Sequence, residues 1–173
     1  MSTIPEKLIS FRVYEDGNDY IGVADVELPE LEAMTDTVKG AGIAGEIDTP
    51  VLGHYSSMEM TLNWRTLEKE NVRMGGFKSR TFDLRGAIQT KDSKTGGITV
   101  RKAKIVVQGM PKKISLGKLD TGSAMDTSTT LEVNYLKVSI DGETYLELDK
   151  YNYICIVDGV DYLSVVREAL GLA

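Results

Sequence analysis

The sequence has almost no cysteine and no long apolar run. Its 173 residues contain one cysteine, Cys155, which excludes an internal disulfide. No apolar run approaches the about 18 residues of a membrane-spanning helix, and the first residues, MSTIPEKLIS, lack the charged-then-apolar layout of a signal peptide. We therefore expect no membrane anchor and a product that stays in the cytoplasm where it is made. In the apolar sequence YNYICIV, Cys155 is expected to be a small buried residue.

Positive charge is outnumbered by negative charge, and histidine is scarce. Twenty Lys and Arg stand against 26 Asp and Glu, which gives a formal net charge of −6. A protein held to nucleic acid by phosphate contacts needs the opposite sign, so we expect no specific nucleic-acid binding. His54 is the only histidine, and a histidine-based metal site would depend mainly on carboxylates. We therefore expect neither a metal nor a cofactor.

One stretch imitates a cofactor loop. Residues 40–45, GAGIAG, match the G-x-G-x-x-G pattern, which binds a dinucleotide only between a buried strand and a helix. The preceding ELEAMTDTVK is polar, and Pro50 disfavours a helical conformation at Thr49. We interpret residues 28–53 instead as a long loop without strand period, in which glycine permits close approach of another chain.

A second stretch imitates a catalytic turn. Asp120 to Ser123, DTGS, match the turn of aspartic proteases, which need two aspartates that share a proton. Here the aspartate follows Lys118 and Leu119 in a polar run, which favours a solvated loop. A small aspartic-protease-like enzyme that uses Asp120 is the alternative hypothesis. A Ser–His pair with His54 also stays open, although no G-x-S-x-G motif supports it.

Strand patterns dominate the rest of the chain. In residues 58–64, MEMTLNW, apolar and polar residues alternate, as in a strand with one buried and one solvated face. The polar face consists of Glu59, Thr61 and Asn63. The other expected elements are two strands about an Asp16-Gly17 turn, a short helix in 66–74, a hairpin of 80–90 and 98–109, strands from Leu131 with an Asp141-Gly142 turn and a bulge near Tyr135, and an amphipathic helix with Leu163, Val166 and Leu170 before Gly171.

The order of these pieces resembles the major tail tube protein of contractile-tailed bacteriophages. The resemblance covers nearly the whole chain and is most specific at YxGVA…LPEL (20–31), GAGIAG (40–45) and DG…E(L)D…N…DGVD (141–161). Residues 69–130 agree mainly in pattern. Similar tubes occur in phage tail-like bacteriocins and in type VI secretion machines.

This resemblance implies a fold and an assembly. The expected fold is mainly β (α+β): one tail-tube domain over residues 1–173, built as a β-barrel-like sandwich of antiparallel strands with a short flanking helix, a C-terminal helix and a long inter-subunit loop. The implied function is structural rather than enzymatic. Six copies would form a ring, and the rings would stack into a hollow tube inside a contractile sheath, as a conduit for DNA or a piercing rod. The particle would be a virion or a phage tail-like particle, assembled in the bacterial cytoplasm.

The resemblance also implies partners and contact residues. The partners would be further copies of the chain, the tail sheath, the baseplate, the tail terminator and a tape-measure protein inside the tube. The expected subunit or ring contacts are at Gly40, Gly42, Ile43, Gly45, Lys91 and Lys94, although a solvated tip is the alternative for the two lysines. Six copies at −6 would give a ring of about −36, whose acidic lumen would let DNA pass. Glu59, Thr61 and Asn63 are the lumen-lining candidates.

Overall fold

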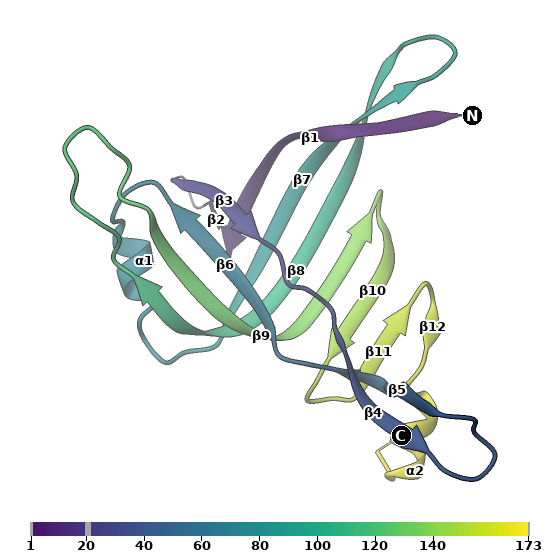
Figure 1. Ribbon diagram of the computed structural model, residues 1–173. Helices are drawn as coiled ribbons and strands as arrows, with labels where there is room; N and C mark the ends of the chain where they lie inside the picture. Colours follow the sequence, from purple (N-terminus) through teal and green to yellow (C-terminus); the bar gives the residue numbers. More distant parts are fainter. Residues whose placement is uncertain (1, 20–21, 173) are drawn as a thin grey trace.

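The computed structural model describes residues 2–19 and 22–172 and shows antiparallel β-structure with two short helices (Figure 1). The strands are β1 (Thr3–Glu15), β2 (Asn18–Asp19), β3 (Val23–Glu27), β4 (Ala33–Lys39), β5 (Glu46–Tyr55), β6 (Met58–Trp64), β7 (Arg80–Asp92), β8 (Ile98–Ser115), β9 (Thr127–Ile140), β10 (Glu143–Asp149), β11 (Ile154–Val157) and β12 (Val160–Asp161). The helices are α1 (Lys69–Arg73) and α2 (Ser164–Ala169). The expected mainly-β class is confirmed. Tyr20, the first residue of the YxGVA motif, lies outside the described residues.

Strand β9 joins the two layers of the structure. One edge of β9 pairs with β8, while the other edge pairs first with β6 and then with β10. The change of partner falls at Asn134, where Tyr135 pairs with Gln108 and Val133 pairs with Gly109. This register shift confirms the bulge predicted near Tyr135. A bulge bends a strand and increases its twist, which lets β9 contribute to both layers of a barrel-like sandwich.

The remaining strands extend from β9. In the described residues the main sheet runs β12-β11-β10-β9-β8-β7-β1-β2, with β6 on β9 and β3 on β6, and β4 and β5 form a separate two-stranded sheet. The Asp16-Gly17 and Asp141-Gly142 turns have positive φ at both residues, as a two-residue hairpin turn requires. Only β2 follows the first turn back along β1, because β3 leaves to pair with β6. The hairpin expected about Asp16-Gly17 is therefore shorter than predicted.

The core lies between the two layers, and β6 shows how the sequence specifies it. The alternation predicted for this strand is confirmed, since Met58, Met60, Leu62 and Trp64 are almost completely buried. They pack in one cluster with Phe82 and Leu84 of β7, Val107 of β8, Leu131, Val133 and Leu136 of β9, and Leu148, Cys155 and Leu163 farther along. Burial of each large apolar side chain contributes about 1.5–3 kcal/mol, so this cluster is the main source of stability.

Helix α1 covers one end of the sandwich and confirms the helix predicted in 66–74. Its fully buried Asn71 accepts a hydrogen bond from the hydroxyl of Thr129 in β9. The same hydroxyl accepts a bond from the indole Nε1 of Trp64 at 3.3 Å. Asn71 Oδ1, Thr129 Oγ1 and Trp64 Nε1 are therefore linked inside the core, which fixes the position of the helix against both strands, whereas Asn71 Nδ2 has no hydrogen-bond partner among the described residues.

Two expectations need correction. Residues 28–53 are not a loop, because β4 and β5 pair through most of this segment. Nearly all of their side chains are exposed, so neither face carries the apolar alternation by which a strand is recognised from sequence. The second correction is Leu170, which is 55% exposed, whereas Leu163 is 2% exposed. Helix α2 has only six residues, so its apolar stripe ends before Leu170.

Candidate functional site

The β4–β5 hairpin projects from one end of the molecule beside α2 (Figure 1). The GAGIAG motif forms its tip, where Gly40, Gly42 and Gly45 have φ of +133°, +90° and +117°. A Cβ on any of them would meet no atom within 4 Å, so the turn needs glycine for its backbone conformation and not for packing within the subunit. Gly45 leads into β5 instead of a helix, which contradicts the dinucleotide hypothesis.

The hairpin carries apolar side chains into solvent. Its exposed large hydrophobic residues are Met34, Val38, Ile47, Val51 and Leu52. A two-stranded ribbon is marginally stable alone, and contiguous exposed apolar surface marks an interaction site. The exposed apolar residues make the hairpin a candidate interaction site.

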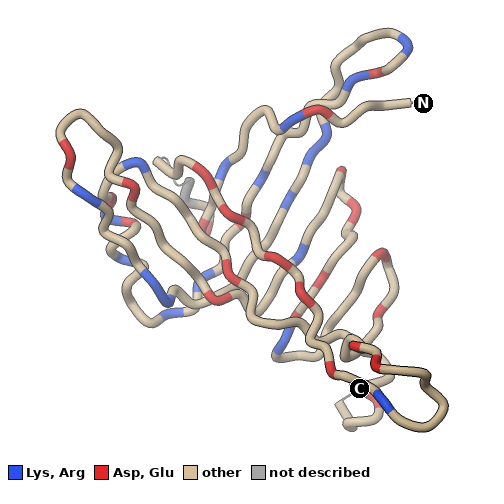
Figure 2. Tube along the Cα trace, in the orientation of Figure 1, with Lys and Arg blue, Asp and Glu red and all other residues tan. Residues whose placement is uncertain are grey.

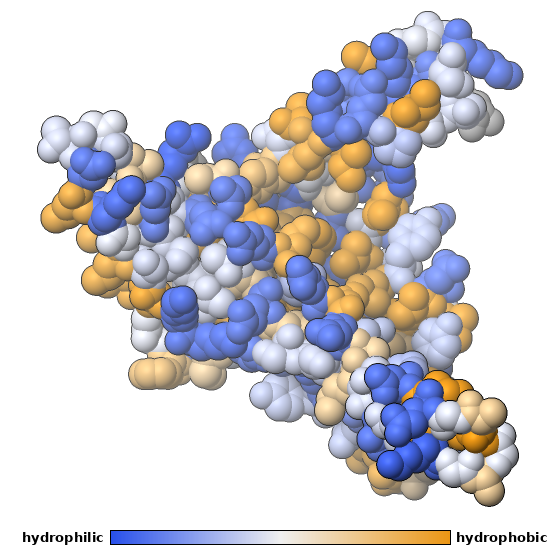
Figure 3. Space-filling model, in the orientation of Figure 1, coloured by the Kyte–Doolittle hydropathy of each residue, from blue (hydrophilic) through white to orange (hydrophobic). Residues whose placement is uncertain are grey.

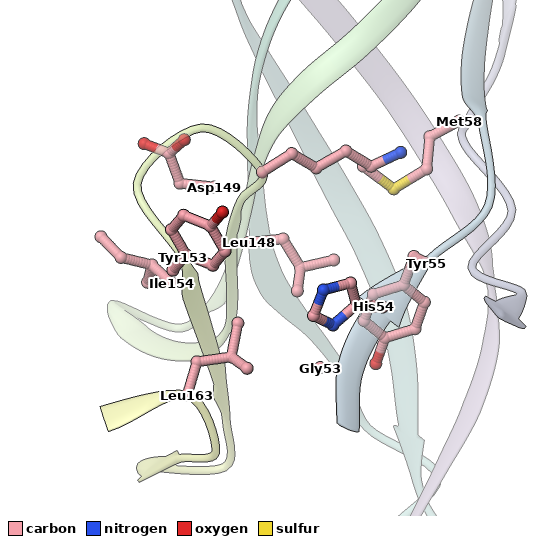
Figure 4. A pocket seen from close by; sticks show the side chains of 10 residues that line it. Gly53, His54, Tyr55, Met58, Leu148, Asp149, Tyr153, Ile154 and Leu163 are labelled. Atoms are coloured by element: carbon pink, nitrogen blue, oxygen red, sulfur yellow. The ribbon is translucent and has the colours of Figure 1, made fainter. Parts of the chain in front are cut away.

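The base of the hairpin is locked to the C-terminal segment. Gly53, with φ +66°, lies against Leu163, and a Cβ at Gly53 would come within 2.6 Å of the Leu163 side chain. These residues, with His54, Tyr55 and Tyr153, line a cavity of about 130 Å³ (Figure 4). His54 Nδ1 lies 2.8 Å from the carbonyl oxygen of Leu52, so the ring is held by its own strand.

Cys155 and the C-terminal residues complete this base. Burial raises the pKa of the Cys155 thiol, and the residue is 2% exposed, which confirms the predicted buried cysteine. Arg167 donates to Asp161 Oδ2 at 2.5 Å and to the carbonyl oxygen of Tyr153 at 2.8 Å. The hydrogen bond from Arg167 lowers the pKa of Asp161. The helix closes at Gly171, which has φ of +74°: the Gly171 amide donates to the carbonyl oxygen of Glu168, and the Leu172 amide donates to that of Arg167.

A second projection, which we call the arm, consists of Thr3–Ile9 of β1, Ile88–Asp92 of β7, Ile98–Ala103 of β8 and the turn 93–97 (Figure 1). It confirms the predicted β7–β8 hairpin. Lys91 is the last residue but one of β7, and Lys94 lies in the turn, where its amide donates to Asp92 Oδ1 at 2.7 Å. The structure places these lysines and the glycine motif on separate projections, so the two predicted contact sites do not form one surface within a subunit.

The polar face of β6 is the third predicted site. Glu59 is exposed, while Thr61 and Asn63 are partly exposed. Lys112 donates to Glu59 and, at 2.9 Å, to Glu132 of β9. The bond to Glu59 is the main cause that raises the pKa of Lys112. Burial raises the pKa of Glu132, but the bonds from Lys112 and Ser57 outweigh it, so the net pKa is lowered. This face is an ordered polar surface.

The DTGS sequence has no catalytic setting. Asp120 lies in an exposed turn between β8 and β9, where Ser123 donates to Asp120 Oδ2 at 3.3 Å. Aspartic-protease catalysis needs two aspartates close enough to share a proton, so the exposed turn does not fit the aspartic-protease interpretation of DTGS. Within residues 2–19 and 22–172, no three His, Cys, Asp or Glu side chains are grouped so that they could hold a metal ion. Of the two described helices, neither is long and apolar enough to cross a membrane.

Charge is distributed unevenly between the projections (Figure 2). Acidic residues follow β3 and its connection to β4, and residues 30–55 hold Glu30, Glu32, Asp36, Glu46 and Asp48 against a single lysine, Lys39. Basic residues follow β7 and β8. The arm holds Lys7, Lys91, Lys94, Arg101 and Lys102 against Glu6 and Asp92. The subunit therefore has an acidic and a basic projection.

The sequence interpretation named Lys91 and Lys94 at the tip of the arm as contact residues, but it missed the apolar groove at the base of the arm. This groove of about 320 Å³ is lined among others by Leu8, Phe11, Leu28, Ile88 and Ile105. Apolar side chains are visible in this hollow in Figure 3. The groove is formed by strands that are far apart in sequence, so no local motif reveals it. Ile4, Leu8 and Ile9 of β1 are exposed, but they do not alternate with polar residues, so the sequence held no clear signal for the groove.

An open-edged β-sandwich with two projections of opposite charge, each exposing apolar side chains, defines a structural protein that assembles with other chains. The chain belongs to the family of phage tail tube protein FII, whose model matches residues 5–171. It is thus a structural tail tube protein, a component of a phage tail or phage tail-like particle.

Individual relatives agree with this assignment. The chain is 29% identical over 174 residues to the tail tube protein of Escherichia phage P2, covering 98% of this chain and 99% of the relative. It is 26% identical to the major tail tube protein of Serratia phage KSP20, covering 98% of each. A cryo-EM structure of the sheath/tube terminator of an extracellular contractile injection system, PVC, matches 76% of this chain and 94% of that chain with a TM-score of 0.52 and 10% identity. The last likeness concerns the fold alone.

Proposed function

We propose that six copies of this chain form a ring and that the rings stack into a hollow tube inside a contractile sheath. The observation that carries the proposal is the β4–β5 hairpin, which exposes apolar residues on both strands of a chain that belongs to a tail tube family. Such surface is costly in an isolated subunit and is stabilised by burial against a neighbour. We propose further that the chain acts as one domain and that the GAGIAG tip reaches a neighbouring subunit or ring.

Negative-stain electron microscopy of the purified protein, with native mass measurement on the same sample, tests this assembly. Hollow tubes or rings of sixfold symmetry are expected. A uniform monomer or dimer over a wide concentration range, also in the presence of a baseplate that could nucleate a tube, would contradict the proposal.

The polar face of β6 is the proposed lining of the lumen. Glu59 is exposed on this face, and Asp25 of β3 accepts a bond from Asn63 at 2.6 Å on the same layer. An acidic lining offers no neutralising contacts to phosphates, so DNA would pass without binding. A Glu59→Cys variant is expected to react in tubes with a small maleimide and not with a long polyethylene-glycol maleimide, since Cys155 is buried. Equal reaction with both reagents would place this face outside the tube.

The proposed partners are the sheath around the tube, the baseplate and terminator at its ends, and a tape-measure protein inside it. We propose no enzymatic activity. Asp120→Asn is expected to leave tube assembly unchanged, because the side chain lies in an exposed turn. A proteolytic activity of the purified protein that Asp120→Asn abolishes would overturn this part of the proposal.

A further inference from the structure

The β4–β5 hairpin and the arm have complementary surfaces. The hairpin offers exposed apolar residues together with three acidic residues, Asp36, Glu46 and Asp48, and one lysine, Lys39, and Glu30 and Glu32 lie just before it. The arm offers an apolar groove beside an excess of basic residues. Opposite charge together with apolar surface on both sides is the complementarity found across specific interfaces.

The arm also has an open strand edge. β1 pairs with β7 along one edge, and in the described residues only β2 occupies the other edge, at Tyr14 and Glu15. Ile4, Leu8 and Ile9 are each about half exposed along this part of β1. An edge of this length invites an added strand unless another chain covers it.

The hairpin of a subunit cannot cover the groove and strand edge of its own arm. The hairpin and the arm extend from different ends of the molecule (Figure 1), and the hairpin base is fixed by Gly53 against Leu163. The seven residues of β4 span about 23 Å, which gives the hairpin the reach to cross an interface. A contact between different patches on two copies is head-to-tail, and such contacts produce rings or filaments.

We infer that the β4–β5 hairpin of one copy docks on the arm of a second copy, with its apolar residues in the groove beside Leu8 and Ile88 and its acidic residues against the lysines of the arm. This inference rests on the proposed tube and identifies the surface that receives the hairpin. The occupant is a second copy of this chain, because the hairpin carries the charge that the arm lacks.

A charge exchange between two variants tests the inference. The first variant, Asp36→Lys/Asp48→Lys, makes the hairpin basic, and the second, Lys91→Glu/Lys94→Glu, makes the arm acidic. All four residues are exposed. Each variant alone brings like charges together at every contact, so its yield of tubes is expected to fall at least about tenfold at low salt. When the two are mixed, each hairpin meets an arm of opposite charge, and tubes in which the variants alternate are expected to return.

The wild-type chain in the same experiment separates this inference from the proposed function. Wild-type tubes, with variants that each assemble alone as well as the wild type, would overturn the docking and leave the tube standing. A mixture of the two variants that stays unassembled, although circular dichroism shows both to be folded, would overturn it as well. Loss of sheath binding with normal tubes would show that the arm binds the sheath and not a second copy. Absence of wild-type tubes would instead refute the proposed function.

A cross-linking measurement covers the case in which a charge variant does not fold. Val38→Cys on the hairpin is combined with Leu8→Cys in the groove, and tubes are treated with a flexible bis-maleimide. The native Cys155 is buried and does not interfere. The matched control pairs Val38→Cys with Leu119→Cys, which is 91% exposed in a different loop. A ladder of multimers for the first pair alone is expected. No ladder, or equal ladders for both pairs, would overturn the docking.

Discussion

Gly53 and Leu163 meet where the projecting hairpin joins the body of the subunit. The backbone of Gly53 lies so close to the buried Leu163 side chain that a Cβ would come within 2.6 Å of it. Gly53 also has φ +66°, in a stretch where four residues of β5 lie opposite a single residue of β4. The direction of the hairpin is therefore set by a contact with the segment before α2, more than 100 residues later in the chain.

Gly53→Ala is expected to destabilise the subunit by about 2–4 kcal/mol, because it adds a clash with the buried Leu163 side chain to the strain of a positive φ. Chemical denaturation of the monomer measures this change. The control is Gly159→Ala, which has φ +79° and open space around its Cβ, and should cost only about 1 kcal/mol. Adding Leu163→Ala should remove part of the clash, so the two effects should not add. Equal costs for Gly53→Ala and Gly159→Ala would show that the contact is loose.

Asp161→Asn is expected to lower stability at neutral pH by about 1 kcal/mol, because it removes the ionic partner of Arg167. The folded-state pKa of Asp161 is lowered, chiefly by that bond, so its contribution is present above the unfolded-state pKa and disappears as the pH falls through the folded value. Thermal unfolding of both proteins between neutral and strongly acidic pH should show their difference closing on the acid side. Asp126→Asn is the control, since the Asp126–Lys118 pair is 3.7 Å apart and largely exposed. A difference that persists in acid would mean that the pair is not its source.

Gly109→Ala is expected to be among the most damaging single changes, with a cost of about 3 kcal/mol or more. Gly109 sits at the bulge where β9 changes partners, and its Cβ would lie 2.3 Å from the carbonyl oxygen of Glu132. Backbone atoms in a ladder cannot give way as a side chain can. Gly86→Ala is the matched control, because its nearest contact is the exposed Leu8 side chain at 3.1 Å. The two free energies of unfolding should differ severalfold, and similar values would mean that the bend tolerates a shift of the backbone.

Gly42→Glu is expected to leave the monomer folded and to prevent tube formation, because a bulky charged side chain would stand at the tip of the hairpin. Electron microscopy and circular dichroism on the same preparation separate assembly from folding. Gly142→Glu carries a similar backbone strain, since φ is +85° there and +90° at Gly42, and both sites are open within the subunit. Tubes should form from the Gly142→Glu protein. Normal tubes from Gly42→Glu would exclude the glycine tip from the interface.

The parts of the fold that the sequence predicted are those governed by local chemistry. The alternation of β6, the Asp16-Gly17 and Asp141-Gly142 turns and the bulge near Tyr135 each depend on neighbouring residues, and the structure confirms them. The β4–β5 hairpin was missed because its strands have no core of their own, so polar and apolar residues face solvent alike. A strand that has no buried face within its own subunit lacks the apolar alternation by which strands are predicted from sequence.

The candidate site divides in the same way. The glycine tip was located as an inter-subunit segment from its resemblance, but its contacts and the lining of the lumen stay predictions. The groove of the arm could not be predicted, because it brings together Leu8, Leu28 and Ile88 from three separate strands or connections. Such a site exists only once long-range pairing has formed.

The position of β9 also bears on how the chain folds. β6 ends at Trp64, yet the strand it pairs with begins at Thr127, so the β6–β9 pairing cannot form until most of the protein has been synthesised. Pairing across such separations is slow, because loop closure must precede the contacts that reward it. The hairpin and the arm lie early enough in the chain to emerge before that closure, with their apolar residues uncovered. A growing chain is thus exposed to premature association, and a polysome-bound fragment that ends before Thr127 is the species in which a chaperone would be needed.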